Sequence, residues 1–167
     1  IDIQGGGSDL LFPHHDMGAA QGQVLASKPF ARTYVHAGMI GLDGEKMSKS
    51  KGNLVFVSKL IQSGHNPIAI RIALMAHPYG NDHMWSSADL YKGEKLLSDL
   101  QTALSRTDVA PTQQLIQEIV IALSNNLDTP KVLILLEDWI KQTLTGATGG
   151  SAGELSRSLD RILGIAL

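Results

Sequence analysis

Cysteine is absent from the 167-residue sequence, which excludes disulfide bonds and a thiolate nucleophile within the chain. No apolar run approaches the roughly 20 residues of a transmembrane helix, because Arg71 interrupts one apolar stretch and Glu137 and Asp138 interrupt another. An initial methionine and a signal peptide are missing as well. We therefore expect a soluble, cytoplasmic protein without a membrane partner, and a chain that begins inside a larger protein.

The second half of the chain has no surplus of basic residues. Residues 86–167 contain seven Lys and Arg against ten Asp and Glu, whereas residues 1–85 contain seven against six. A surface that follows a nucleic acid backbone normally needs a basic patch, because neutralising phosphates supplies most of the affinity. The second half is therefore not typical of a nucleic-acid-binding surface.

The sequence divides into two stretches. The first contains short β-strand patterns separated by glycines. "IDIQ" and "TYVHAGMIGL" read as strands, the first entering a glycine turn and the second closed by an Asp43-Gly44 turn. "DMGAAQGQVLASK" between them reads as a helix. Residues 1–65 therefore predict the back end of an α/β domain.

The second stretch, residues 66–167, predicts a helical bundle. Leucines at helical spacing and capping residues mark its helices. The expected helices are 67–77 with Asn66 as N-cap, 88–106 capped by Ser86 or Ser87, 112–125, 130–144 capped by Thr129, and a short last helix opened by a Ser151–Glu154 capping box. The composition of residues 145–152 predicts a flexible linker. Trp85 and Trp139 are expected to anchor the core.

Two motifs in the first stretch each permit two interpretations. In "GGGSD", three glycines let a ligand lie against the backbone and Asp9 offers a carboxylate to a ribose, or Ser8 or Asp9 simply caps a glycine turn. In "FPHHD", His14 and His15 suit a metal or a phosphate, although a pair without a third ligand is more often not a metal site.

A third motif, "GLDGEKMSKSKGN", places three lysines on a glycine-bounded loop. Considered alone, Lys46, Lys49 and Lys51 are most simply a solvated turn. The combination of the glycine motif, "FPHH" and "KMSKS" nevertheless resembles the nucleotide-binding half of class I aminoacyl-tRNA synthetases, and closely their cysteine-activating branch. "KMSKS" is the signature loop of that class at full length. The resemblance implies a Rossmann-like α/β domain, followed here by a helical bundle.

The resemblance also implies roles for particular residues. Lysines of the signature loop hold the phosphates of Mg-ATP, which stabilises the charge of the transition state. The residues carried over are Lys46, Lys49 and Asp9 for catalysis, with Gly7, Ser8, Asp9, Ile40, Lys46, Ser48 and Lys49 for ATP and adenylate binding.

A zinc site is the third implication. Cysteinyl-tRNA synthetases place a zinc-binding glutamate four residues after the first histidine, where this chain has Gly18. The resemblance therefore assigns zinc to His14 with the other ligands outside this chain, and leaves His15 and Asp16 structural. His36 has a core role or a substrate-proximal role. His65, His77 and His83 are expected to be surface or structural residues.

The chain resembles the cysteine ligases of mycothiol biosynthesis, which are relatives of these synthetases. The resemblance rests on the departure at Gly18 and on the stretch "FARTYVHAGMIGLDGEKMSKSKGNLV". The chain then corresponds to a C-terminal part, inactive by itself, of a monomeric enzyme. That enzyme activates L-cysteine as cysteinyl-adenylate and transfers it to the amine of glucosaminyl-inositol, with no tRNA partner. A cysteinyl-tRNA synthetase fragment and a non-catalytic nucleotide-binding module are the alternatives.

Overall fold

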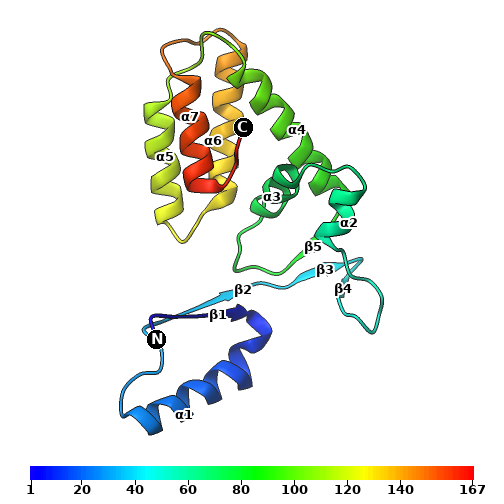
Figure 1. The fold of residues 1–167 in the computed structure, drawn as a ribbon, viewed down its shortest axis with the longest axis vertical. Coiled ribbons are helices and arrows are strands. Elements are labelled where there is room, and N and C mark those ends of the chain that lie inside the picture. The colour runs from blue at the N-terminus through cyan, green and yellow to red at the C-terminus, as the bar shows by residue number, and fades with distance from the viewer. The chain divides into compact units, whose positions relative to one another are not determined.

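The computed structural model describes all 167 residues as two compact units (Figure 1). The strand unit comprises Ile1–Leu54 and Tyr79–Trp85, and the helical unit comprises Val55–Pro78 and Ser86–Leu167. These units do not follow the predicted division at residue 65, because a short helix before that point packs with the helices and a later strand returns to the sheet. The division into 1–65 and 66–167 stays a prediction about domains.

The strand unit begins with a parallel β–α–β arrangement. Strand β1 (Ile3–Gly7) pairs with β2 (Thr33–Ala37), so that Gly6 lies opposite His36. Two short turns of helix, Ser8–Leu10 and Leu11–His15, lead from β1 into α1 (Asp16–Ala26). The predicted turn at the three glycines is wrong, since these residues continue the strand and pair with β2.

A second, three-stranded sheet completes the strand unit. Strand β3 (Ile40–Leu42) pairs antiparallel with β4 (Glu45–Lys46) and parallel with β5 (His83–Trp85). The turn between β3 and β4 is the predicted one, with positive φ at both of its residues, Asp43 and Gly44.

The single strand predicted over residues 33–42 is two strands. The backbone amides between these two strands donate to residues 79–82 and not to a neighbouring strand. The Gly38 amide donates to the Tyr79 carbonyl (2.8 Å), and the Met39 amide donates to the Asp82 carboxylate (2.7 Å). A Cβ at position 38 would lie 2.2 Å from the Asn81 backbone, so only glycine allows this approach.

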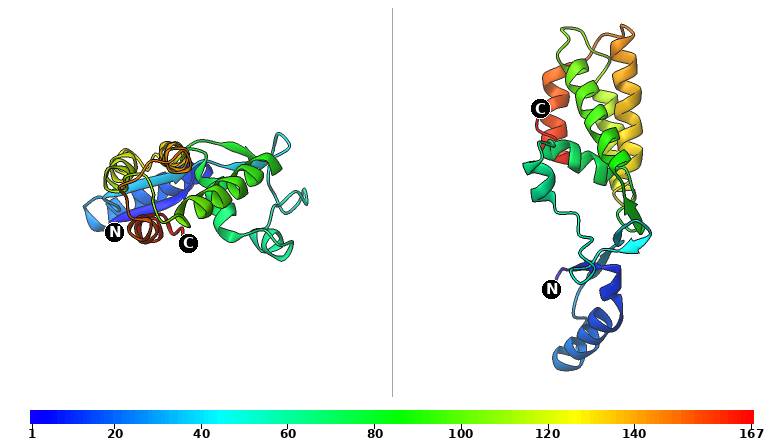
Figure 2. Two further views of the ribbon diagram at one scale, coloured as in Figure 1. Left: turned by 90° about the horizontal axis from the view of Figure 1, so that it is seen from above. Right: turned by 90° about the vertical axis from the view of Figure 1, so that its right-hand side faces the viewer.

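The helical unit contains six helices, with α4, α5, α6 and α7 lying side by side (Figure 2). The helices are α2 (Val57–Gln62), α3 (Pro67–Met75), α4 (Ser87–Leu104), α5 (Gln113–Ser124), α6 (Thr129–Leu144) and α7 (Ala152–Leu163). Helix α2 carries too short an apolar pattern to have been predicted. None of the helices combines the length and apolar character that crossing a membrane requires.

Leucines at the predicted helical spacing form the core of this unit. Leu100, Leu136 and Leu155 are almost completely buried. Trp139 is buried with them and donates its indole N–H to the Ala110 carbonyl (3.1 Å), which confirms it as a core residue. Trp85, in β5 of the strand unit, is only half-buried.

Most predicted helix starts are confirmed by capping bonds. The Asn66 side chain accepts from the Ile68 amide, and the Ser86 hydroxyl accepts from the Asp89 amide. The cap of α6 is Asp128 rather than Thr129, because the Asp128 carboxylate accepts from the Lys131 amide (3.1 Å). A carboxylate with its two acceptor oxygens is a strong cap, and this one shifts the helix start by one residue.

The end of the segment before α7 contacts a remote part of the chain, and its flexibility as a linker stays a prediction. The Gly150 amide donates to the Val109 carbonyl (2.9 Å), and a Cβ on Gly150 would lie 1.9 Å from the Ala110 carbonyl oxygen. Ser151 caps α7 through the Glu154 amide as predicted. Its own amide donates to the Thr112 hydroxyl (3.2 Å) instead of to Glu154, so only half of the predicted capping box is present.

Candidate functional site

The strand unit brings together two residues that are distant in the sequence at the C-terminal end of β1. Strand β1 ends at Gly7, and the helical turn after it presents Asp9. Lys46, the last residue of β4, extends its side chain to this turn, and its Nζ lies 3.0 Å from Asp9 Oδ2. Two of the predicted catalytic residues, 37 positions apart in the sequence, are therefore in direct contact.

This contact sets the charge state of Asp9. The hydrogen bond from the Lys46 ammonium holds the pKa of the Asp9 carboxyl below its ordinary value. The pair therefore stabilises the fold above the ordinary carboxyl pKa, and this contribution is lost as the pH falls through the lowered value. The two side chains are 58% and 44% exposed, so solvent screens the attraction and the contribution to stability is small.

The glycines of β1 make room for side chains of the same unit. A Cβ on Gly6 would lie 2.7 Å from Cε1 of His15, and one on Gly7 would lie 2.5 Å from Oδ1 of Asp9. The same position on Gly7 lies 3.4 Å from the sulfur of Met39, the residue before Ile40. Gly7, Asp9 and the start of β3 are thus neighbours. The roles of Gly7, Ser8 and Ile40 in adenylate binding stay predictions.

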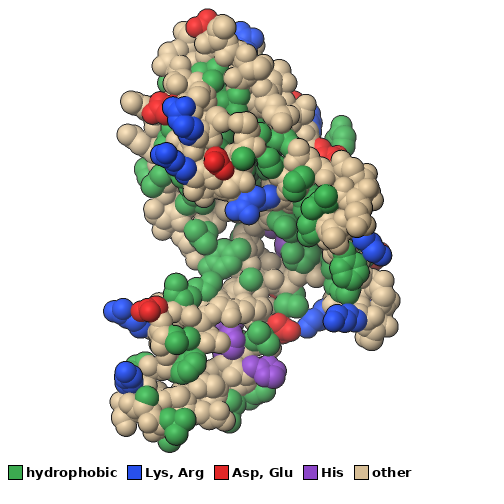
Figure 3. Space-filling model, viewed as in Figure 1, with side chains coloured by type: hydrophobic (Ala, Val, Ile, Leu, Met, Phe, Trp, Pro, Cys, Tyr) green, Lys and Arg blue, Asp and Glu red, His purple; other side chains and the backbone are tan.

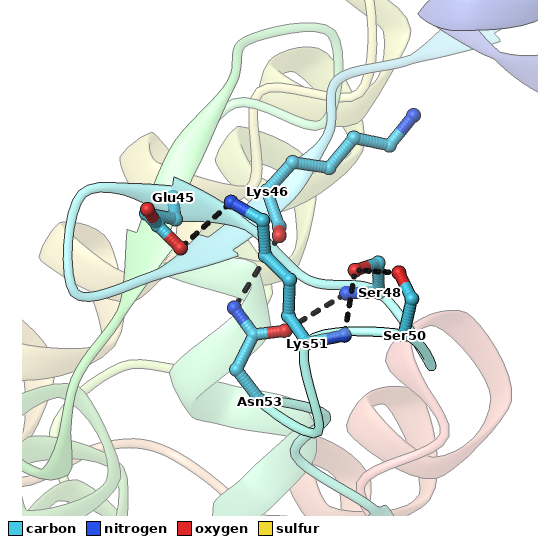
Figure 4. A network of polar contacts seen from close by, with 6 residues as sticks. All are labelled: Glu45, Lys46, Ser48, Ser50, Lys51 and Asn53. Atoms are coloured by element: carbon cyan, nitrogen blue, oxygen red, sulfur yellow. Dashed lines mark hydrogen bonds and ion pairs between the residues drawn. The ribbon is translucent and has the colours of Figure 1, made fainter.

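The signature loop that follows β4 is held by a side chain to which the sequence assigned no role (Figure 4). Asn53 accepts from the Ser48 amide at its Oδ1 (2.9 Å) and donates from its Nδ2 to the Lys46 carbonyl (3.3 Å). The preceding Gly52 has a φ of 67°. A Gly-Asn pair at the end of a loop is a turn signal and was the available hint.

The three lysines of the loop have different partners. Lys46 contacts Asp9, and Lys51 places its Nζ 2.8 Å from Oε2 of Glu45. Lys49 is exposed and its ammonium forms neither a hydrogen bond nor an ion pair. Lys49 is therefore the lysine of this loop whose charge is uncommitted.

The Ser48 hydroxyl gives the loop a tight turn around Lys49. Its oxygen lies 3.2 Å from the Ser50 hydroxyl and accepts from the Lys51 amide (3.3 Å). The Gly52 amide donates to the Lys49 carbonyl (3.2 Å) and closes the same turn. The sequence placed Ser48 against the ligand, and in this structure its hydroxyl contacts the loop itself.

The histidines of "FPHH" have separate environments. His15 Nδ1 and His36 Nε2 share a hydrogen bond of 2.8 Å, and both rings line an open cavity of about 360 Å³ with Phe12 and Tyr34. His14 is exposed and makes no hydrogen bond. The structure therefore joins His15 to His36, and leaves His14 available.

A metal site is not formed by this chain alone. No group of three or more His, Cys, Asp or Glu side chains is arranged to hold a metal ion. Gly18 supplies no donor, and nothing lies within 4 Å of where its Cβ would be. His14 is the single predicted ligand that the chain contributes, so its residues do not by themselves fit a zinc ion.

Two further histidines lie in the helical unit and link its helices. His65 Nδ1 lies 2.7 Å from a Glu94 oxygen, and His77 Nε2 lies 3.6 Å from an Asp89 oxygen. Burial raises the pKa of Asp89, but the Ser86 hydroxyl and His77 outweigh it, so its pKa lies below the ordinary value. These contacts fit the predicted structural roles of His65 and His77.

Comparison with known proteins agrees with the predicted resemblance. Residues 1–95 match the family described as the tRNA synthetase class I (C) catalytic domain. Proteins named "L-cysteine:1D-myo-inositol 2-amino-2-deoxy-alpha-D-glucopyranoside ligase" from Streptomyces avermitilis and Streptomyces coelicolor are 50% identical over 170 residues. One of the same name from Catenulispora acidiphila is 45% identical over 179 residues. Each alignment covers 100% of this chain and 42% of the relative.

A solved structure confirms the fold class. LeuRS of Agrobacterium radiobacter K84 agnB2, in a ternary complex with tRNA and LeuAMS, superposes with a TM-score of 0.73. The match covers 98% of this chain and 26% of LeuRS at 17% identity, so it bears on the fold alone. This chain spans less than half the length of the ligases it matches, and its correspondence to their C-terminal part stays a prediction.

Proposed function

This chain belongs to the class I (C) tRNA synthetase catalytic-domain family, and from that premise we propose that the full-length protein is an ATP-dependent cysteine ligase. It joins L-cysteine to the amine of glucosaminyl-inositol and forms AMP and pyrophosphate. The observation that carries the proposal is the 45–50% identity, along the whole of this chain, to ligases whose name states these two substrates.

The reaction proceeds in two steps. A carboxylate oxygen of cysteine attacks the α-phosphorus of ATP, the bond to the bridging oxygen of the β-phosphate breaks, and pyrophosphate leaves with that electron pair. The sugar amine then attacks the carbonyl carbon of cysteinyl-adenylate, AMP leaves with the bonding electrons, and the nitrogen loses a proton to give the amide. Negative charge accumulates on the phosphates in the first step, where preorganised ammonium groups are most effective.

Lys49 and Lys46 supply these charges in different ways. Lys49 is uncommitted and available to a phosphate without breaking any contact. Lys46 already has an anionic partner in Asp9. A triphosphate, with its higher charge, replaces Asp9 as the partner of Lys46 and frees the Asp9 carboxylate for the ribose hydroxyls. Gly7, Ser8 and the Ile40 backbone hold the adenylate, Ser48 lies at the phosphates, and Mg²⁺ accompanies the ATP.

A cysteinyl-tRNA synthetase is the second candidate, favoured by the description of the matching family. The charges of this chain argue against it. The helical unit lies mostly in the half with seven basic and ten acidic residues. On the visible face of Figure 3, Lys and Arg side chains alternate with Asp and Glu and form no continuous basic stripe. Binding of tRNA phosphates normally needs a basic patch.

The acceptor experiment separates the two candidates. The full-length protein should consume cysteine and ATP in the presence of glucosaminyl-inositol and form AMP in step with the amide. It should form no cysteinyl-tRNA, and tRNA should not inhibit at physiological salt, where weak phosphate contacts are screened. Measurable charging of tRNA with cysteine, without amide formation, would overturn the ligase proposal.

Zinc is part of the proposal, with His14 as a ligand and the remaining ligands outside this chain. When bound, zinc supplies a soft Lewis acid that prefers the sulfur of cysteine to the hydroxyl of serine. Replacing His14 by alanine should lower the zinc content of the purified full-length protein. His15→Ala is the matched control and should retain zinc, because His15 bonds to His36 instead. Equal zinc loss in both variants, measured by elemental analysis, would show that His14 is not the ligand.

A further inference from the structure

The side chain of Asn53 lies between two backbone groups of the signature loop. Its amide oxygen accepts from the Ser48 N–H, and its amide nitrogen donates to the Lys46 carbonyl. The two bonded groups stand on either side of Met47. One planar side chain therefore fixes the path of the backbone where the loop leaves β4 (Figure 4).

Apart from the turn around Lys49 and the pairing of β4 with β3, few contacts hold the loop at this point. Met47, Ser48 and Asn53 are half-buried, and Lys46 and Lys49 are exposed, so no core packing determines the position of the two lysines. The ion pair between Lys51 and Glu45 joins exposed side chains and is screened by solvent. The paired hydrogen bonds of Asn53 connect the residues on both sides of Met47 to the loop exit.

The conformation of the loop determines the position of the Lys49 ammonium group, which has no partner. Ser48 begins the turn that carries Lys49, and its N–H is held by Asn53 while its hydroxyl accepts from the Lys51 amide. Lys46, whose carbonyl accepts the second bond, is the lysine that contacts Asp9. Loss of the Asn53 amide would free the Ser48 backbone next to Lys49 and remove one restraint on Lys46, which keeps its pairing with Gly41.

We infer that Asn53 is a positioning residue, which holds Lys46 and Lys49 in the geometry that the phosphate-transfer step requires. This inference rests on the proposed function for its chemistry and on the two hydrogen bonds for its structure. Asn53 touches no substrate in this role and acts through the loop backbone. A shift of about 1 Å in a charged group near the reacting phosphate costs as much as 100-fold in rate.

The test compares Asn53→Ala, which removes both bonds, with Asn53→Asp, which keeps the acceptor for Ser48 but cannot donate to Lys46. In the full-length protein, Asn53→Ala should lower kcat of cysteine-dependent ATP–pyrophosphate exchange by about 10- to 100-fold. Asn53→Asp should fall between it and the wild type. The affinity for a non-hydrolysable cysteinyl-adenylate analogue and the thermal midpoint should be unchanged. Asn125→Ala, at an exposed asparagine whose side chain makes no hydrogen bond, is the matched control.

A second readout does not depend on the activity. The hydrogen-exchange rate of the Ser48 amide, measured by NMR without ligands, should rise in Asn53→Ala and stay slow in Asn53→Asp. A Ser48 amide that stays protected in Asn53→Ala, or an Asn53→Ala enzyme with wild-type kcat, would overturn the inference. If the wild-type protein showed no exchange reaction, the proposed function would fail, and the Ser48 amide would still decide whether Asn53 holds the loop.

Discussion

Replacing Lys49 by alanine in the full-length protein should remove about 2–4 kcal/mol of transition-state stabilisation, the amount lost with one preorganised polar contact to a developing charge. At 25 °C this lowers kcat/KM for cysteine-dependent ATP–pyrophosphate exchange by roughly 30- to 1,000-fold. Lys49 is the lysine of this loop whose ammonium has no partner, so its charge is fully available to the phosphates. Initial rates of pyrophosphate exchange at varied ATP measure the loss.

Lys51→Ala is the control for this prediction because it removes the same charge from the same loop. Lys51 is paired with Glu45 in the structure, so its loss should lower the rate much less. Binding of a stable cysteinyl-adenylate mimic, which lacks the pyrophosphate, should weaken little in either variant. Unchanged exchange in Lys49→Ala would show that the loop is a solvated turn, and an equal loss in Lys51→Ala would show a general effect of charge.

Local patterns predicted the helical unit well, because each of its longer helices carries its own signal. The leucines of α4 recur at helical spacing, and Asn66 and Ser86 mark helix starts by the bonds that they accept. The Asp43-Gly44 turn is equally local, since both residues tolerate positive φ. These features need only neighbouring residues, so one sequence is enough to find them.

Structural features that depend on residues distant in the sequence were missed. Strand β3 has three residues and pairs with β5, more than 40 positions later, so neither strand has a periodic pattern to read. The segment before α7 has a linker composition, but the backbone of Val109 and Ala110 supplies its partners. Composition reports the character of an isolated segment, and it does not reveal a contact with a remote loop.

The candidate site shows the same division. The lysines and Asp9 were identified by resemblance, whereas their contact depends on pairing β1 with β2 and on the β3–β4 hairpin. That Lys46 has a partner and Lys49 has none could not be read from "KMSKS", because both residues look alike in the motif. Asn53 is the last residue of "GLDGEKMSKSKGN", and its role became visible only from its two hydrogen bonds to the loop backbone.

The crossing of α3 and α4 depends on one glycine, and a single methyl group there should have a large effect on stability. A Cβ on Gly93 of α4 would lie 2.4 Å from the Ala69 carbonyl oxygen and 3.1 Å from the Ala73 nitrogen, both backbone atoms of α3. Ala69 and Ala73 are themselves buried, so their small side chains bring the two helices together. Backbone atoms cannot rotate away as a side chain can, so the helices must separate.

Gly93→Ala should therefore lower the free energy of unfolding of the full-length protein by about 2–3 kcal/mol, in the upper part of the usual range for overpacking. This loss exceeds the gain of about 0.5–1 kcal/mol that alanine gives over glycine inside a helix. Urea denaturation measures the change, and faster hydrogen exchange of the α3 and α4 amides locates it. Gly153→Ala in α7 is the matched control, because its Cβ would meet only the end of the long Arg157 side chain at 3.3 Å. The control should be as stable as the wild type or slightly more so, and a Gly93→Ala protein of equal stability would show that α3 and α4 do not pack this closely.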